Sequence, residues 1–457
     1  MLRTSLGVSA ALYVALALAR PVSAQTDIER AYRSDADRLI EAAVGDSAAY
    51  DRLAELVDRF GHRLSGSASL ELAIDWILDQ MEADGLENVR GEPVPVPHWV
   101  RGEESIRMLQ PRRKELPMLG LGGSVGTPPG GIRSEVVVVG SFAELEARAD
   151  EAAGRIVLFN VPFTSYGQTV RYRGGGAVAA ARVGAVASII RSVTNYSQQT
   201  PHTGAMGYAE GVTKIPHAAI TVEDAEMIQR MVDRGERVEL VIEMEAKTLP
   251  DVMSRNVVAE IVGRESPEEV VVLGGHIDSW DVGQGAMDDA GGSVAAWEAV
   301  RLMKDLGLRP RRTVRVVLWA NEENGLAGGN GYRDSHLEEV GDHVLAMESD
   351  GGLFRPLGFG FTGSDDAFQI MQRVGRLLDR IGAGRITRGG GGADIGPLQR
   401  EGVPGMGLQV DGERYFWYHH TDADTIDKLD PREVGLSVAA MAVIAYVIAD
   451  LPERLPR

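Results

Sequence analysis

Histidine and carboxylate residues recur in four short segments of the second half of the chain. The segments are Gly274-Gly-His-Ile-Asp278 with the stretch to Gly292, Ala320-Asn-Glu-Glu-Asn-Gly325, Met347-Glu-Ser-Asp-Gly-Gly352 and Tyr415-Phe-Trp-Tyr-His-His-Thr421. Because the chain contains no Cys, any transition metal must be held by imidazole and carboxylate groups. These two ligand types together suit Zn²⁺, so the four segments predict a zinc centre.

The five candidate ligands divide into two sets that share one carboxylate. We expect His276, Asp288 and Asp350 to bind one ion, and Asp288, Glu323 and His420 to bind the other. A carboxylate shared between two cations relieves the repulsion of crowded negative charges. The sequence therefore predicts two Zn²⁺ per chain, with Asp288 bridging them.

The adjacent acids Glu322 and Glu323 need different roles, because neighbouring side chains on a turning backbone diverge. With Glu323 as a ligand, Glu322 is expected to be the general base: it takes a proton from a water that bridges the metals and later protonates the departing amine. Asp278, two residues after His276, is expected to fix the tautomer of that imidazole from behind.

Each of these motifs is weak when taken alone, since a His-x-Asp at a strand end or a Glu-Glu pair is usually an ordinary polar surface feature. Their appearance together, in order, after successive predicted strands is what favours a site. His419 is expected to serve packing or substrate contact rather than ligation. The remaining histidines are expected to be structural or surface residues: His62, His98, His202, His217, His336 and His343.

The elements around these segments alternate between strand and helix. Apolar runs at 270–273, 314–319 and 344–347 predict buried strands, and helical periodicity covers 293–306 and 431–451. Such alternation predicts an α/β fold with a mainly parallel sheet covered by helices on both faces. In such sheets a site forms beyond the carboxyl ends of the strands, which is where the candidate ligands lie.

The region 106–250 differs in composition and pattern from the segments on either side. A Gly/Pro-rich loop at 119–131 precedes five short strand-like runs, which predict an inserted, smaller β-rich domain. The expected organisation is a signal peptide at 1–24, a catalytic domain at 25–105 and 251–457, and the insert at 106–250.

The first residues predict export. Arg3 precedes an apolar run at 6–19, and Val22-Ser-Ala24 supplies the small residues of a cleavage site. We therefore expect a secreted or periplasmic protein without stable membrane insertion after cleavage. A formal net charge of -19 argues against a nucleic acid partner.

The segments Gly-Gly-His-Ile-Asp-Ser-Trp-Asp-Val-Gly-Gln-Gly-Ala-Met-Asp-Asp, Asn-Glu-Glu-Asn-Gly, Met-Glu-Ser-Asp and Tyr-His-His-Thr-Asp-Ala-Asp-Thr resemble those of the M28 family of zinc peptidases. The carboxypeptidase Q branch is the most similar, and the 106–250 block resembles that family's protease-associated domain. The resemblance implies a two-zinc exopeptidase with the five ligands above, Glu322 as catalytic acid and base, a cis peptide bond at Asp288-Asp289 and a homodimer.

The expected function is thus a secreted two-zinc exopeptidase that hydrolyses short peptides, unblocked dipeptides foremost. The alternatives are an aminopeptidase acting on longer peptides, a non-catalytic binding relative and an acyltransferase of the glutaminyl cyclase kind. Trp280 and the aromatic run Tyr415–Tyr418 are candidates for a substrate wall or for packing.

Overall fold

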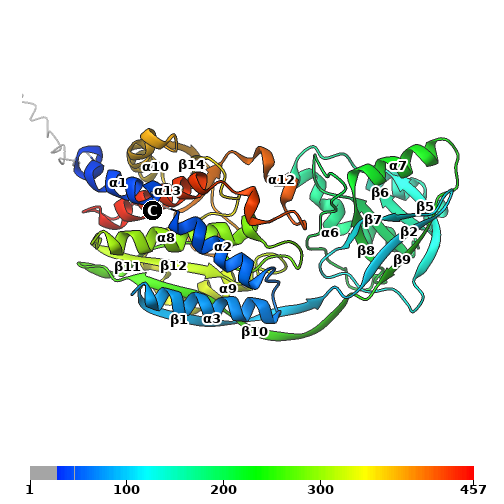
Figure 1. Cartoon of the computed structure of the whole chain (residues 1–457), viewed down its shortest axis with the longest axis horizontal. Helices are drawn as coiled ribbons and strands as arrows, with labels where there is room; N and C mark the ends of the chain where they lie inside the picture. The colour runs from blue at the N-terminus through cyan, green and yellow to red at the C-terminus, as the bar shows by residue number, and fades with distance from the viewer. Residues whose placement is uncertain (1–27, 46) are drawn as a thin grey trace, which may run out of the picture.

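The computed structural model describes residues 28–45 and 47–457 and shows two lobes side by side along the long axis of the molecule (Figure 1). The predicted signal peptide at 1–24 lies outside the described residues. Each lobe has its own eight-stranded sheet. We call the lobe that contains both ends of the described chain the catalytic lobe, and the other the inserted lobe.

The sheet of the catalytic lobe is mixed, which corrects the expectation of a mainly parallel one. β12, β11, β13 and β16 run parallel in its middle, whereas β1, β10 and β14 pair in antiparallel fashion. The order is β1 (Glu87–Val100), β10 (Lys247–Ile261), β12 (Arg312–Trp319), β11 (Ser266–His276), β13 (His343–Glu348), β16 (Gly405–Val410), β14 (Pro356–Thr362) and β15 (Arg385–Arg388).

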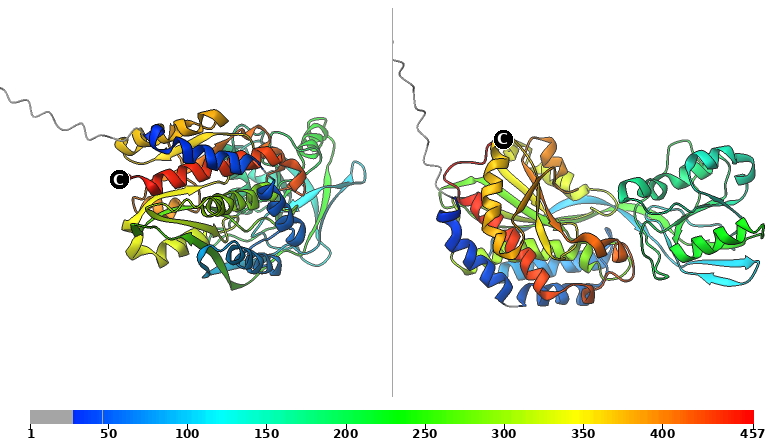
Figure 2. Two further views of the ribbon diagram at one scale, coloured as in Figure 1. Left: turned by 60° about the vertical axis from the view of Figure 1, so that its left-hand side comes forward. Right: turned by 90° about the horizontal axis from the view of Figure 1, so that it is seen from above.

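Helices cover both faces of this sheet (Figures 1 and 2). The helix α13 is apolar on nearly every side and packs against α1, α8 and the sheet. Of the described helices, it alone is long and apolar enough to cross a membrane, yet almost all of it is buried in the lobe. The main helices are α1 (Ile28–Gly45), α2 (Ala48–Phe60), α3 (Ala68–Ala83), α8 (Gly291–Asp305), α9 (Ala327–Ser335), α10 (Asp365–Gly375), α11 (Gly396–Arg400) and α13 (Pro431–Asp450).

The inserted lobe is more than the β-rich core expected from the sequence. Its strands β5 to β8 run parallel, and helices connect β5 to β6 and β6 to β7, because its short apolar runs alternate there with helical segments such as α6. The sheet order is β3 (Lys114–Leu116), β2 (Glu104–Gln110), β9 (Glu239–Met244), β5 (Ile132–Val139), β6 (Ile156–Phe159), β7 (Ala187–Arg191), β8 (His217–Ile220) and β4 (Met118–Gly120). The helices are α4 (Phe142–Ala147), α5 (Ala149–Ala152), α6 (Tyr166–Arg182) and α7 (Val222–Asp233).

A long antiparallel ribbon of β1 and β10 joins the two lobes. The strands pair from Glu87 with Glu260 to Val100 with Lys247, so the chain leaves and re-enters the catalytic lobe at neighbouring points. Figure 2 shows both strands running toward the inserted lobe. Arg101, just past the ribbon, forms an ion pair at 2.5 Å with Asp281 of the catalytic lobe. The predicted domain boundaries at 106 and 250 fall inside β2 and β10.

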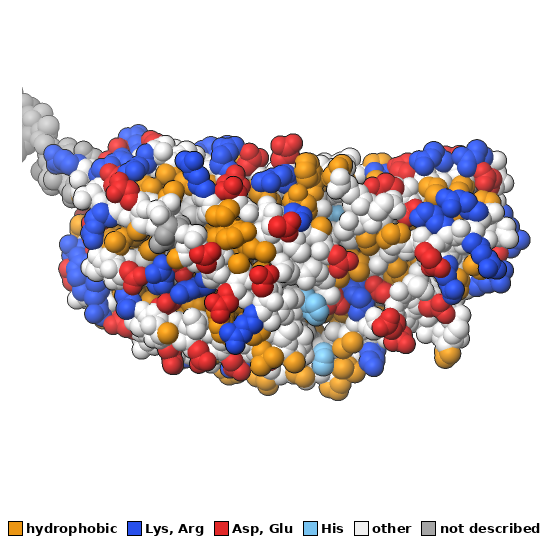
Figure 3. Space-filling model, in the orientation of Figure 1, with side chains coloured by type: hydrophobic (Ala, Val, Ile, Leu, Met, Phe, Trp, Pro, Cys, Tyr) orange, Lys and Arg blue, Asp and Glu red, His pale blue; other side chains and the backbone are white. Residues whose placement is uncertain are grey.

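On the face shown in Figure 3, acidic and basic side chains are interspersed over the catalytic lobe rather than separated into fields of one sign. Many acidic and basic side chains of the described residues form ion pairs, such as Arg255 with Glu71 at 3.0 Å and Arg380 with Asp37 at 2.7 Å. This face therefore shows no large patch of one charge.

The buried histidines His217 and His343 each contribute a loss of stability in acid. Burial lowers the pKa of each from 6.5 to about 4, so between these values the unfolded chain binds protons that the folded protein does not. The contribution of each group to the free energy of unfolding therefore falls with falling pH by up to about 1.4 kcal/mol per pH unit, whereas buried acids such as Glu348 and Asp424, whose pKa is raised to about 7, contribute in the opposite direction. Urea unfolding of metal-free wild-type and His343→Gln protein between about pH 7 and pH 5 isolates the contribution of His343. The stability of His343→Gln should fall less steeply with falling pH than that of the wild type, and equal slopes would show that His343 does not contribute.

Candidate metal centre

The predicted ligands meet at the carboxyl edge of the catalytic sheet. β11 ends at His276, directly beside Trp319 at the end of the parallel strand β12, and Glu323 follows β12. Asp350 follows the end of β13, the neighbour of β11 on its other side. His420 arrives from a more distant element, the short helix α12 (Tyr415–Tyr418). The strand ends thus place all the predicted ligand segments at one edge.

Two groups of side chains face one another through Asp288. The His276 Nε2 atom lies 3.2 Å from Asp288 Oδ1 and 3.6 Å from Asp350 Oδ1. The His420 Nε2 atom lies 3.3 Å from Asp288 Oδ2 and 3.0 Å from Glu323 Oε2. The two oxygens of Asp288 therefore face different imidazoles, which is the arrangement expected of a bridging carboxylate.

Several atoms at this centre are buried without a hydrogen-bond partner, namely His276 Nε2, Asp288 Oδ2 and Glu323 Oε1. Leaving such atoms unpaired in a dry interior costs free energy, and a cation in contact with them would offset that cost. Candidate ligand atoms of His276, Asp288 and Asp350 lie within 4.8 Å of one another. Nitrogen and oxygen donors in this mixture suit zinc. The residues present therefore fit a metal centre.

The charges at the centre are strongly interdependent. Burial alone would lower the pKa of His276, but the carboxylates of Asp288 and Asp350 raise it well above its usual value. Burial raises the pKa of Glu323 to about 7, against the opposing effect of His420. The cluster thus holds more acidic groups than its imidazoles can balance, which favours the binding of a divalent cation.

Glu322 stands apart from the ligand groups. Its Oε2 atom lies 4.0 Å from His276 Nε2, and its side chain is 22% exposed, whereas that of Glu323 is only 3% exposed. Burial among Asp350, Glu323 and Asp288 raises the pKa of Glu322 well above its usual value. A carboxylate in this setting binds a proton more readily than a surface carboxylate does.

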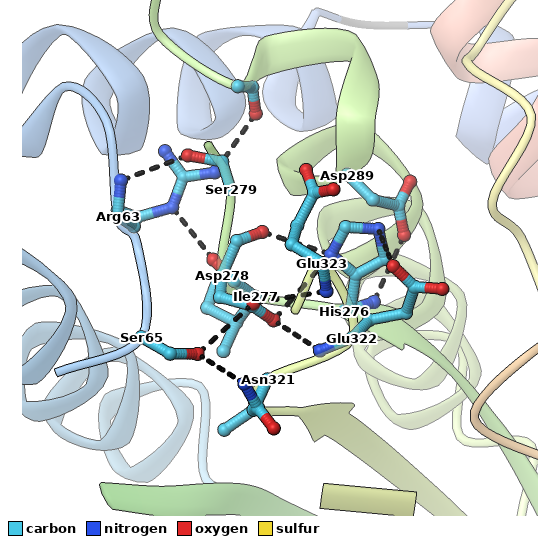
Figure 4. A network of polar contacts seen from close by, with 12 residues as sticks. Arg63, Ser65, His276, Ile277, Asp278, Ser279, Asp289, Asn321, Glu322 and Glu323 are labelled. Atoms are coloured by element: carbon cyan, nitrogen blue, oxygen red, sulfur yellow. Dashed lines mark hydrogen bonds and ion pairs between the residues drawn. The ribbon is translucent and has the colours of Figure 1, made fainter. Parts of the chain in front are cut away.

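The structure changes the expected role of Asp278. The His276 Nδ1 atom is 3.0 Å from the backbone oxygen of Asp278 but 3.7 Å from its carboxylate, so the carbonyl accepts the imidazole proton. The carboxylate instead accepts hydrogen bonds from the backbone N–H groups of Glu322 at 3.0 Å and Glu323 at 3.4 Å. As Figure 4 shows, Asp278 thereby fixes the turn that carries both acids.

Two further buried aspartates were not recognised from the sequence. Asp424 accepts hydrogen bonds from the backbone N–H groups of Met287 at 2.7 Å and Asp288 at 3.2 Å, which shapes the loop that presents Asp288. Asp289 accepts one from the backbone N–H of His276 at 3.1 Å. The Asp288-Asp289 peptide bond is cis, as the family resemblance implies. Asp424 lies in the Thr-Asp-Ala-Asp-Thr segment that resembles the M28 family. That resemblance could have marked Asp424 as a site residue, whereas the spacing of the ligands could not.

No motif in the sequence marks Arg63 as a residue of the site. Its side chain is fully buried and donates hydrogen bonds to the carbonyls of Ile277 at 2.9 Å, Gln284 at 2.8 Å and Gly285 at 2.9 Å. These bonds tie the end of β11 to the loop before Asp288 (Figure 4). Burial lowers the pKa of this guanidinium to about 10, and it remains charged near neutral pH.

The aromatic run on α12 packs against the inserted lobe. The ring of Phe416 lies 5.3 Å from that of Tyr166 in a stacked arrangement, and Trp417 lies 5.0 Å from Tyr196. His419 stacks on His420 at 3.5 Å, with its Nε2 atom 3.6 Å from Asp288 Oδ2, so it lies closer to the ligands than the sequence indicated.

Trp280 also belongs to this boundary between the lobes. Its side chain is buried within the apolar core of the inserted lobe, and its ring is 5.7 Å from that of His420. A Cβ atom on Gly122 would lie 1.9 Å from the Trp280 ring, so only glycine fits there. This packing places Trp280 in the contact between the lobes.

The inserted lobe also contributes a cation. The Arg173 Nη1 atom lies 3.3 Å from His420 Nδ1, and Nη2 donates a hydrogen bond to the Tyr166 hydroxyl at 2.7 Å. The Arg173 Nε atom is buried without a hydrogen-bond partner. Among residues 28–45 and 47–457, Arg173 forms no ion pair with any carboxylate. A buried guanidinium without an acidic partner therefore lies behind the His420 ring, on the side away from Asp288 and Glu323.

Comparison with known proteins agrees with this geometry. The model of peptidase family M28 matches residues 256–445, which include every predicted ligand. Carboxypeptidase Q of Mus musculus is 51% identical over 429 residues, 93% of this chain and 91% of that protein. Carboxypeptidase Q of Homo sapiens is 52% identical over 408 residues, 89% of this chain and 86% of that protein.

One solved structure leads to the same family, and another shares the fold. A peptidase M28 precursor from Shewanella amazonensis is 35% identical, with a TM-score of 0.90 over 94% of this chain and 99% of that one. A zinc aminopeptidase from Bacillus subtilis shares the fold, with a TM-score of 0.66 at 19% identity over 89% of this chain and 96% of that one. The chain therefore belongs to peptidase family M28, and it is a metallo-exopeptidase of that family.

Proposed function

We propose that this protein is a two-zinc exopeptidase that hydrolyses short peptides with a free C-terminal carboxylate, unblocked dipeptides foremost. His276, Asp288 and Asp350 would hold one ion, and Asp288, Glu323 and His420 the other. The support for two ions is that the two oxygens of Asp288 face different imidazoles. When bound, the zinc pair lowers the pKa of water and polarises the scissile carbonyl.

Glu322 is proposed as the catalytic acid and base. Its side chain lies at the edge of the ligand cluster and is partly exposed, so it can contact a bound substrate. It takes one proton from the attacking water and returns that proton to the departing amine, so the carboxylate is regenerated in each cycle. Asp278 keeps Glu322 in place through its hydrogen bond to the backbone N–H.

Arg173 is the observation that carries the proposed substrate class. A guanidinium recognises a carboxylate through paired hydrogen bonds, and this one is buried without an acidic partner. Its Nη1 atom lies 3.3 Å from His420 Nδ1, on the side of the ring away from Asp288 and Glu323, so the guanidinium is a near neighbour of the metal centre without being one of its ligands. A short substrate, such as a dipeptide, is the kind whose C-terminal carboxylate stays this near to the scissile bond.

The test compares a free dipeptide with its C-amidated and N-acetylated forms and with a tripeptide, in the presence and absence of a chelator. Chelator-sensitive cleavage of the free dipeptide, with the amidated form cleaved poorly, supports the proposal. Cleavage of the amidated form and of the tripeptide from the N-terminal end would make the protein an aminopeptidase instead.

Arg173→Met should lower kcat/KM for the free dipeptide by about 10- to 100-fold, because a hydrogen-bonded charge is lost. It should scarcely change the slower cleavage of the amidated form, whose carboxylate is absent. Arg171→Met is the matched control, since Arg171 is an exposed residue of the same helix. An equal effect of Arg173→Met on both substrates would contradict recognition of the carboxylate.

We further propose that the protein is exported, acts on peptides rather than nucleic acid and forms a homodimer. Export is supported by the signal-like pattern at 1–24, and the exclusion of nucleic acid by the acidic net charge. The proposal that residues 28–45 and 47–457 hold no membrane anchor is supported by the burial of α13. The dimer rests on the family resemblance alone. The N-terminal sequence of the cell-free protein and its mass by light scattering test these proposals.

A further inference from the structure

The backbone of the inserted lobe runs beside the segment that carries His420. The N–H of Thr203 donates a hydrogen bond to the backbone oxygen of His420 at 3.0 Å. His202 Nδ1 donates one to the backbone oxygen of His419 at 2.7 Å, because a carbonyl can only accept. Both His202 and Thr203 are buried. Two consecutive residues of one lobe thus hold two consecutive residues of the other.

The same segment also contacts the imidazole of His420. The Thr203 carbonyl lies 3.3 Å from His420 Nδ1, on the opposite side of the ring from the Nε2 atom that faces Asp288 and Glu323. A histidine that binds a metal through one nitrogen usually donates its other N–H to a carbonyl or carboxylate, which fixes the ring. Thr203 is therefore the acceptor placed to orient His420.

The backbone of His420 needs such support. Its φ of 62° lies in the left-handed region, which is strained for a non-glycine residue and persists only where surrounding contacts impose it. The hydrogen bonds from His202 and Thr203 act on this residue and on the one before it. The inserted lobe thus supplies contacts that hold the strained conformation.

The first ligand group is held differently. His276 Nδ1 donates to the carbonyl of Asp278, and Asp424 supports the loop of Asp288, all within the catalytic lobe. Only the second group, through His420, has its supporting acceptor on the inserted lobe among the contacts described for these ligands. The two metal sites therefore differ in their dependence on that lobe.

We infer that the inserted lobe completes one of the two metal sites, with His202 and Thr203 as positioning residues for His420. This inference rests on the proposed assignment of two metals. Loss of the His202 contact should selectively weaken the site formed by Asp288, Glu323 and His420. The site formed by His276, Asp288 and Asp350 should keep its metal.

The test is zinc content after equilibrium dialysis of the purified full chain against buffered zinc, measured by atomic emission. His202→Ala should retain one zinc at wild-type affinity and bind the second about 10- to 100-fold more weakly, the usual effect of losing a residue that orients a ligand. Its pattern should match that of His420→Ala. His202→Asn, whose amide N–H can replace the donor to the His419 carbonyl, should restore most of the lost affinity.

His217→Ala is the matched control. His217 is also a fully buried histidine of the inserted lobe, but its hydrogen bonds go to Ser188 and Tyr172 within that lobe. This variant should keep both zinc ions. Circular dichroism of the metal-free variants reports whether each still folds.

Wild-type affinity at both sites in a folded His202→Ala protein would overturn the inference. Equal weakening of both sites, or loss of the second zinc in His217→Ala as well, would overturn it too, since the effect would then not be specific to His420. A wild-type protein that binds fewer than two zinc ions would instead refute the two-metal assignment itself, so the two failures are distinguishable.

Discussion

Glu322→Gln should keep its metal and lose turnover by about 10³-fold. The amide has nearly the shape of the carboxylate but cannot accept a proton from water, and general base catalysis contributes about 10²- to 10⁴-fold to such reactions. The hydrogen bond from the Glu322 backbone N–H to Asp278 does not involve the side chain, so the turn should be preserved. The measurement is kcat for a free dipeptide together with zinc content.

Glu338→Gln makes the same chemical change at a residue on the surface of the catalytic lobe, and it should leave kcat unchanged. A Glu322→Gln enzyme that still turns over within tenfold of the wild-type rate would show that another group accepts the proton. Zinc loss in Glu322→Gln would show that this residue acts as a ligand rather than as the base.

Asp288→Ala should abolish binding of both metals and, with it, measurable activity. The variant removes the one side chain that faces both His276 and His420, and it leaves Asp350 and Glu323 in two incomplete groups. His420→Ala should reduce only one of the two affinities. Zinc content measured under identical dialysis conditions distinguishes the two variants.

Asp366→Ala, an exposed position at the start of α10, is the control for a lost aspartate, and its zinc content should equal that of the wild type. Equal zinc content in Asp288→Ala and His420→Ala would mean that Asp288 does not bridge. In that case the nearness of its two oxygens to both imidazoles would reflect packing alone.

The meeting of the proposed ligands at one edge of the sheet could be predicted because they follow the ends of strands. A buried apolar run is visible in a sequence, and in neighbouring parallel strands the next residues must emerge at the same edge. His276 and Asp350 were located in this way, and β11 and β13 are indeed parallel neighbours. For these two residues, the position predicted from the sequence pattern and the position in the structure are the same edge of the sheet.

The supporting residues could not be predicted in the same way. Arg63 and Arg173 reach the centre from elements far away in the sequence, and their hydrogen bonds go to backbone carbonyls and a phenol, which leave no pattern. The role of Asp278 was misjudged because spacing does not reveal whether the carbonyl or the carboxylate faces the ring.

The direction of the outer strands was also beyond the sequence pattern. β10 pairs antiparallel with β1 because the chain returns from the inserted lobe along the strand by which it left, and β10 is also antiparallel to its other neighbour, β12. A buried strand has the same apolar pattern whether it runs parallel or antiparallel to its neighbours. Apolar runs alone could therefore not distinguish a mixed sheet from a parallel one.

The ribbon of β1 and β10 has a consequence for the order of folding. Val100 and Lys247 pair directly although the whole inserted lobe separates them in sequence. Closing so long a loop in an unfolded chain costs conformational entropy, but a folded inserted lobe already holds the two ends together. The ribbon then closes as a short hairpin would. The order of folding with the smallest entropic barrier therefore starts in the inserted lobe and reaches the sheet of the catalytic lobe through the ribbon.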